Sequence, residues 1–318
     1  MKSLWVRVTR AVRQHPVSFL TWAVVLGGWE IAAHLAPAST LENSPLVPSW
    51  EFVFTRALKE LSGSWTLPYW APNPISGGKE TYLGALLALG YHSLVTFRRL
   101  LLGLGVGVFV GVGSGLAISY SSWLRRLAWT PLNLLRMAPL LAAIPLFQFW
   151  LGANTVGSTA FIGFGVWVLL VVATINAVTN VPDKYVESAR TLGASRLRTY
   201  LTVVVPGSVP ELRTSLLLAA GLSWSLTVGA EYIGLRSGLG TILATAEFFT
   251  NTGRMIIIAV LIAFYALMTF ALLDRLFRRL VRWLPSLEAG TSITRVAGAA
   301  GLGLAETATE TQLDLNAK

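Results

Sequence analysis

The sequence predicts an all-α, polytopic membrane protein with about six transmembrane helices. The chain has 318 residues, of which 54% are hydrophobic and only 13% are charged, a far more apolar balance than that of soluble domains. Residues 100–124 contain no charged side chain, and residues 127–182 contain only Arg136. Because a helix satisfies its own backbone hydrogen bonds, such runs can cross about 30 Å of hydrocarbon.

Six apolar stretches account for the expected spans, and we place them at residues 17–36, 100–120, 127–150, 156–178, 212–233 and 254–273. The first stretch follows a basic leader, so a cleaved signal peptide is the alternative to an anchor helix. Its length and the weak cleavage site after it favour a retained helix.

The same pattern divides the chain into segments. We expect a basic cytoplasmic N-terminus at 1–16, the first span at 17–36 and an extracytoplasmic segment at 37–82. A membrane core with five spans would then occupy 83–284. Residues 285–318 are dominated by Ala, Thr, Glu and Gly, a composition that cannot bury a core and predicts a disordered cytoplasmic tail.

The distribution of basic residues predicts the orientation of the spans. With both termini in the cytoplasm, fifteen Lys and Arg residues fall on the inner side and seven on the outer side, as the positive-inside tendency requires. Arg98 and Arg99 fit this orientation least well. Cytoplasmic loops explain the formal charge of +10, so we expect contact with membrane lipid and none with nucleic acid.

The outer segment and the start of the core suggest surface elements. Residues 43–78 are rich in Pro, Gly and Trp, and Trp50, Trp65 and Trp70 are candidate interfacial anchors. We expect residues 83–97 to form a short helix along the outer surface before the second span, with a structural His92.

The second span carries a glycine repeat suited to close helix packing. Gly103, Gly107, Gly111 and Gly115 recur at intervals of four, so one helix face has no side chains. A neighbouring backbone can therefore approach this face closely.

The third span is expected to bend and to line a passage. Prolines remove backbone donors and favour bends, and this span contains Pro131, Pro139 and Pro145. Three polar side chains of the same span could line a solute pathway or serve packing alone. They are Asn133, Arg136 and Gln148.

A polar insert at residues 182–206 interrupts the apolar pattern after the fourth span. Pro182 suits the first turn of a helix, and Gly193 ends that helix as a C-cap. Ser195 can cap a second short helix, which we expect to close before Pro206. Two short helices joined at a glycine form a compact projection, and the amphipathic first helix predicts docking of a partner protein.

The residues of this insert resemble a known motif. Glu187, Ser188, Ala189, Gly193 and the later run Val203-x-Val205-Pro206 resemble the EAA…G…I·LP (EAA) motif of ABC importer permeases, with mild departures at Ser188, Val203 and Val205. The resemblance extends over residues 83–284. Within the family it is most similar to the nitrate, sulfonate, taurine and bicarbonate branch, as in "RMAPLLAAIPLFQFWLG" and "GAEYIGLRSGLGTIL".

The resemblance implies a fold like that of type I ABC importer permeases and a transport subunit with no catalytic residues of its own. No Walker A loop occurs in the chain, so ATP and Mg would be bound by partner ATPase subunits. The other implied partners are an extracytoplasmic solute-binding protein and a second copy of the chain. The implied location is the bacterial inner membrane, and the implied solute is a small anion or organic anion.

The resemblance also implies roles for particular residues. The ATPase-coupling set is Tyr185, Glu187, Ser188, Ala189, Arg190, Gly193 and Pro206. Within it, Glu187 would orient the helix in the ATPase groove, Ala189 would allow close contact, and Gly193 would make the sharp turn.

Glu231 is the other residue that stands out, because an acid beside an uncharged run is costly in lipid. It lies near the outer end of the fifth span, before the "SGLG" run at 237–240, a stretch similar to part of the family's gate. We expect Glu231 to pack helices or gate the pathway, with Arg236 as its candidate partner. Trp224 is a further pathway candidate.

Two other classes of protein compete with this interpretation. A membrane enzyme would need clustered ligands, but the chain has three His, no Cys and no grouped carboxylates, so we expect no metal site. A secondary transporter working without an ATPase would call for inverted repeats and buried coupling charges. Co-purification of an ATPase would separate the importer subunit from both.

Overall fold

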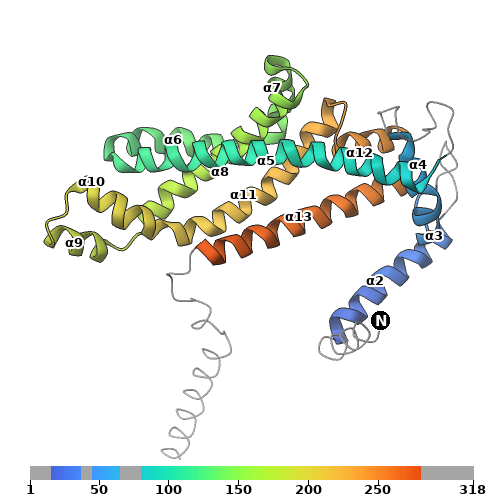
Figure 1. The fold of residues 1–318 in the computed structure, drawn as a ribbon, viewed down its shortest axis with the longest axis horizontal. Coiled ribbons are helices and arrows are strands. Elements are labelled where there is room, and N and C mark those ends of the chain that lie inside the picture. Colours follow the sequence, from blue (N-terminus) through green and yellow to red (C-terminus); the bar gives the residue numbers. More distant parts are fainter. Residues whose placement is uncertain (1–15, 37–44, 65–79, 281–318) are drawn as a thin grey trace, which may run out of the picture. The chain divides into compact units, whose positions relative to one another are not determined.

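The computed structural model describes residues 16–36, 45–64 and 80–280, and the elements in these ranges are helical (Figure 1). The chain divides into two compact units, residues 1–273 and 274–318. All of the features below lie in the first unit, apart from the end of the last helix. The expected N-terminal segment at 1–16, apart from Pro16, the tail at 285–318, Trp65 and Trp70 lie outside the described residues.

The elements that precede the core come first in chain order. They are α2 (Pro16–Leu35), α3 (Trp50–Phe52), the π-helix η1 (Val53–Ala57), α4 (Leu58–Glu60) and the 3₁₀ turn η2 (Leu61–Ser64). The remaining elements are α5 (Tyr82–Tyr120), α6 (Ser122–Met137), η4 (Leu140–Ala143), α7 (Ile144–Leu151), α8 (Thr155–Thr179), α9 (Asp183–Thr191), α10 (Arg196–Thr199), η5 (Tyr200–Val204), α11 (Val205–Gly234), α12 (Leu239–Phe248) and α13 (Thr252–Leu280).

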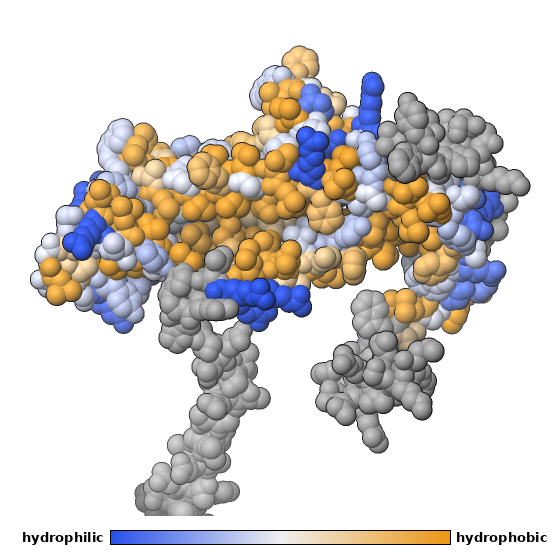
Figure 2. Space-filling view, in the orientation of Figure 1, coloured by the Kyte–Doolittle hydropathy of each residue, from blue (hydrophilic) through white to orange (hydrophobic). Residues whose placement is uncertain are grey.

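Four helices in the described ranges are long and apolar enough to cross a membrane: Tyr82–Tyr120, Thr155–Thr179, Arg196–Gly234 and Thr252–Arg279. A bent pair made of α6 and the η4–α7 segment could supply a fifth span. The expected first span coincides with α2, of which Ala23–Leu35 is a shorter apolar helix. In Figure 2 the surface over α5 and α11 is mostly apolar, and hydrophilic residues lie over α9 and α10.

The expectation of a separate surface helix at 83–97 is wrong, because α5 runs unbroken from Tyr82 to Tyr120. The first half of α5 buries Ala85, Ala88 and Thr96. Ala85 joins a core cluster with Leu61 of η2 and Leu239 of α12. Since tertiary packing supports this half of the helix, it continues directly into the second span.

The glycine repeat of α5 packs closely against α8, as its spacing predicts. A Cβ added at Gly107 would lie 2.5 Å from Cβ of Val166, and one added at Gly115 would lie 2.5 Å from Cβ of Thr174. By contrast, an added Cβ at Gly105 meets nothing within 4 Å. The bare face therefore permits a backbone approach that any larger residue would block.

The third expected span is bent by 90° between Ser122–Met137 and Leu140–Leu151. The break lies at Ala138 and Pro139, both of which have extended backbone. Pro131 stays inside α6, and Pro145 falls in the first turn of α7, where its missing N–H costs little. Of the three prolines, only Pro139 marks the bend.

The described part of the outer segment is attached to the rest of the first unit at several places, including the packing of Leu61 against α5 and α12. Trp50 contacts α2, where its indole nitrogen donates to the Leu26 carbonyl and its ring faces Trp29. Glu60 accepts hydrogen bonds from Asn251 at 2.7 Å and from Arg254 at 3.3 Å, at the start of α13. Trp50, which the sequence suggested as an interfacial anchor, therefore packs against α2.

Candidate functional site

The polar insert folds into two short helices, and we call residues 182–206 the elbow. Pro182 is the N-cap of α9, one position before the expected first turn. After α9, Gly193 adopts φ +80°, its N–H donates to Arg190 O, and the Ala194 N–H donates to Ala189 O. These two bonds form a Schellman motif, which requires a left-handed residue and therefore favours glycine.

The second half of the elbow differs from the expectation. Ser195 caps α10 as predicted, its hydroxyl accepting the Arg198 N–H at 3.4 Å. The helix does not close before Pro206, however, because the chain continues through the π-helix η5 into α11. Pro206 falls in the first turn of α11, directly after the π-helix, where its missing N–H costs little.

Contacts on one side hold the elbow against the ends of α5 and α8. Val186 of α9 packs on a cluster formed by Val178, Val181 and Val204. The Tyr200 hydroxyl donates to Leu116 O of α5 at 2.7 Å. The Arg196 guanidinium donates to the carbonyl of Tyr120 at 2.9 Å and lies over its ring. A force on α9 would therefore reach the ends of two long helices.

The opposite side of α9 is open. Tyr185 is 53% exposed and Leu192 is 88% exposed. Glu187, Ser188 and Arg190 are also exposed, while Ala189 is half-buried between them. The result is a short apolar strip at Tyr185, Ala189 and Leu192, while Glu187 is exposed on another face of α9.

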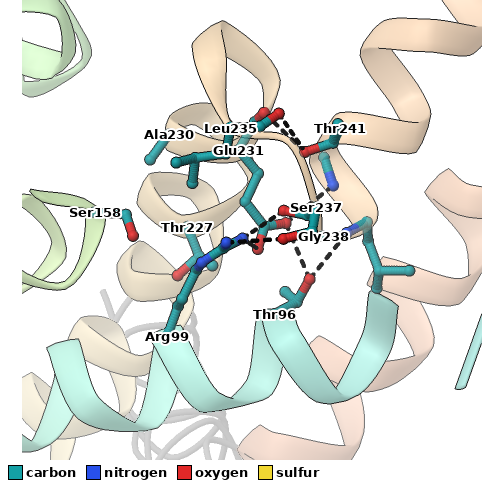
Figure 3. A network of polar contacts seen from close by, with 12 residues as sticks. Thr96, Arg99, Ser158, Thr227, Ala230, Glu231, Leu235, Ser237, Gly238 and Thr241 are labelled. Carbon is teal, nitrogen blue, oxygen red and sulfur yellow. Dashed lines mark hydrogen bonds and ion pairs between the residues drawn. The ribbon is translucent and has the colours of Figure 1, made fainter. Parts of the chain in front are cut away.

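A second polar cluster lies at the other end of α11, around Glu231, and Figure 3 shows it from close by. Glu231 is fully buried. One carboxylate oxygen accepts a hydrogen bond from Arg99 of α5 at 2.9 Å. The other accepts from the Thr96 hydroxyl at 2.9 Å and from the Gly240 N–H at 3.0 Å.

Arg99, and not Arg236, is the ion-pair partner of Glu231. The Arg99 guanidinium also donates to the carbonyl and to the hydroxyl of Ser237, in the loop between α11 and α12. A buried carboxylate and a buried guanidinium are paired here, and removing either one would leave a costly buried charge. We call Thr96, Arg99, Glu231 and the loop residues 237–240 the latch.

His92 joins the latch to the outer segment. Its Nδ1 accepts the Gly238 N–H at 2.9 Å, so Nδ1 carries no proton. Its Nε2 lies 3.0 Å from Ser64 O and must therefore donate, which fixes the neutral Nε2–H tautomer. Gly238 has φ +121°, and an added Cβ there would collide with the Glu231 carboxylate. The loop can lie this close only because the residue is glycine.

The expected pathway residues do not meet at one place. Asn133 donates to the Trp129 carbonyl of its own helix at 2.8 Å. Trp224 is buried between the rings of Phe97 and Tyr265. Gln148 of α7 donates to Ala230 O at 3.4 Å, next to the latch. These contacts indicate packing for Trp224, a bond within α6 for Asn133 and an interhelical bond for Gln148.

Arg136 is exposed at the end of α6 and lines a cavity of about 210 Å³ between α6, α8 and α11. Its polar companions there are Asn176, Glu211 and Ser215. Glu211 accepts a hydrogen bond from Asn180 at 2.8 Å. Within the described ranges, no group of three or more His, Cys, Asp or Glu side chains could hold a metal ion.

Sequence reasoning missed Arg99, Thr96 and His92 as members of the cluster. A signal was present, since the three residues follow one another at i, i+4 and i+7 on one helix face. Polar side chains with that spacing in an apolar stretch indicate a shared buried partner.

Comparisons with known proteins agree with this architecture. Residues 103–284 match the family described as binding-protein-dependent transport system inner membrane component. The taurine transport system permease protein TauC of Escherichia coli is 28% identical over 271 residues, which cover 85% of this chain and 90% of that protein. The putative aliphatic sulfonates transport permease protein SsuC of the same organism is 30% identical over 204 residues, 64% of this chain and 78% of that protein.

Two solved structures share the fold. One describes inward-facing conformations of the MetNI methionine ABC transporter, with a TM-score of 0.54, 18% identity and coverage of 61% of this chain and 96% of that chain. The other is a bacterial ABC transporter involved in import of the acidic polysaccharide alginate, with a TM-score of 0.50, 14% identity and coverage of 86% and 99%. The family match spans more than half of the sequence, and the chain therefore belongs to the binding-protein-dependent transport system inner membrane components, as a multi-pass ABC importer permease.

Proposed function

We propose that the chain carries a small organic anion of the sulfonate or taurine class across the bacterial inner membrane. A separate ATPase would drive this transport by binding the elbow. The names of its relatives support this solute class. A solute-binding protein would deliver the anion from outside. ATP and Mg would be bound by the ATPase, and both termini would be cytoplasmic.

The observation that carries the proposal is the two-sided construction of α9. One side is fixed to α5 and α8 through Val186 and the neighbouring Tyr200. The other side presents the exposed Tyr185 and Leu192, and Glu187 is exposed on a further face of the same helix. An exposed apolar strip on a rigid helix is the form in which a groove-bearing partner binds a helix.

A second copy of the chain would complete the passage. Arg136 is exposed in the described part of the chain, although it lies within an apolar bent pair. A guanidinium facing lipid at mid-membrane costs about 2.5–3.5 kcal/mol. That cost disappears if Arg136 faces an aqueous pathway between two copies, where its charge would also favour an anionic solute.

The latch would act as part of the outer gate. Its bonds hold the loop at 237–240 against α5, so α5 and the end of α11 would move together. Glu231 would serve this gate as a positioning group. Direct binding of an anion by Glu231 is disfavoured because both groups are negative.

The proposal is tested by charge reversal on α9. Glu187→Arg keeps the helix but inverts an exposed charge of α9, and Gly193→Val strains the turn at the end of this helix. We expect both variants to reach the membrane, to lose the co-purifying ATPase and to lose solute uptake. The matched control is Glu247→Arg, an exposed charge reversal on α12. Parental uptake by the two elbow variants would show that the elbow is not the coupling element.

A further inference from the structure

The elbow borders an open cavity, whose lining shares only Arg190 with the ATPase-coupling set. It lies between the ends of α5 and α8, helices α9 and α10, and η5. Its volume is about 190 Å³, far above the ~10–15 Å³ that one water molecule needs. Its polar lining is Ser119, Tyr120, Arg190, Arg196, Thr199 and Tyr200.

The charged side chains of this lining are all positive. Arg190 and Arg196 contribute two guanidinium groups, and the lining contains no Asp or Glu. In the described ranges neither arginine forms an ion pair with a carboxylate. Arg196 uses one nitrogen on the Tyr120 carbonyl, which leaves further donors on a group that carries five N–H.

Thr199 adds an independent sign of a missing ligand. Thr199 is 3% exposed, and its hydroxyl has no hydrogen-bond partner. A buried hydroxyl without a partner is destabilising, so most buried hydroxyls in native proteins have a hydrogen-bond partner. The neighbouring Tyr200 hydroxyl is already used by Leu116 O and does not satisfy it.

We propose that this cavity binds a small tetrahedral oxyanion, a phosphate or sulfate group. Such a ligand offers acceptors in several directions, so it can accept from guanidinium groups of α9 and α10 together, and rotation of the Thr199 side chain would bring its buried hydroxyl within reach as well. The cavity has room for one such group with some water. By bridging Arg190 and Arg196, the anion joins the two helices of the elbow and stiffens it.

The test uses the purified full-length chain in detergent, freed of phospholipid. Sodium sulfate and sodium phosphate are titrated calorimetrically, with chloride keeping the ionic strength constant. We expect saturable binding to the parent, at least tenfold weaker binding to Arg196→Gln and several-fold weaker binding to Thr199→Val. The matched control Arg198→Gln removes an exposed guanidinium that does not line the cavity and should bind as the parent does.

Thr199→Val keeps the side-chain shape, and its melting temperature without anion shows whether it is folded. A cavity that holds only water gives no saturable heat with either anion, and this result overturns the proposal. Equal affinity in the parent, Arg196→Gln and Thr199→Val overturns it as well. Competition by short-chain phosphatidylglycerol would identify a lipid headgroup as the source of the bound oxyanion, and sulfate binding unaffected by that lipid would identify a free anion.

Discussion

The buried ion pair between Arg99 and Glu231 makes a quantitative prediction about stability. Arg99→Gln removes the guanidinium but keeps a polar side chain of moderate length. Arg99 and Glu231 side chains are 5% and 0% exposed, and their closest atoms are 2.9 Å apart. The substitution therefore leaves a carboxylate buried without a countercharge.

The size of the effect follows from these distances. At 2.9 Å and an effective dielectric constant of about 20, the attraction between unit charges is roughly 6 kcal/mol. The variant does not lose this whole attraction as stability, because the Thr96 hydroxyl and the Gly240 N–H still donate to the Glu231 carboxylate. Breaking one side of a buried pair costs about 3–5 kcal/mol in measured cases. We expect Arg99→Gln to lower the unfolding free energy by about 3 kcal/mol, near the lower end of that range.

The assay is the unfolding free energy of the purified protein in detergent, with Arg98→Gln as the matched control. Arg98 is the neighbouring residue and is exposed, so its replacement should change the unfolding free energy by less than about 1 kcal/mol. In the double variant Arg99→Met with Glu231→Leu, no buried charge remains, and most of the stability should return. Equal losses for Arg98→Gln and Arg99→Gln would refute the latch as a stabilising element.

Two further predictions concern packing and passage. Gly107→Val forces a side chain into Val166 of α8 and should lower the unfolding free energy by about 1–3 kcal/mol. The control Gly105→Val lies on the open face of α5 and should not lower it. Equal losses of unfolding free energy in the two variants would argue against the glycine contact. Arg136→Gln removes the exposed charge at the cavity between α6, α8 and α11 and should reduce anion uptake several-fold while the ATPase still co-purifies. Uptake at the parental rate would place Arg136 outside the pathway.

Features that depend on neighbouring residues could be predicted from the sequence. The repeat from Gly103 to Gly115 predicted a bare helix face, and that face meets α8. Ser195 and Gly193 predicted the caps of the elbow, where short-range backbone bonds decide the conformation. The proline-rich third span predicted a bend, and the chain turns at Pro139.

Features that depend on distant residues could not be predicted in the same way. Arg99 and Glu231 are 132 positions apart, and no local pattern pairs them. The continuation of α5 through residues 83–97 depends on burial against Leu61 and Leu239, which are also distant in sequence. The π-helix η5, which lies just before Pro206, could not be predicted either, because a proline alone does not specify a π-turn.

Uptake by reconstituted vesicles tests the central claim most directly. The chain is placed in liposomes with and without its ATPase, with ATP on the side of the elbow and a solute-loaded binding protein on the other side, and taurine is the labelled solute. We predict uptake only when the chain, the ATPase and ATP are all present, and none with Glu187→Arg. Taurine uptake by the chain alone, at the same rate without ATP, would contradict the account.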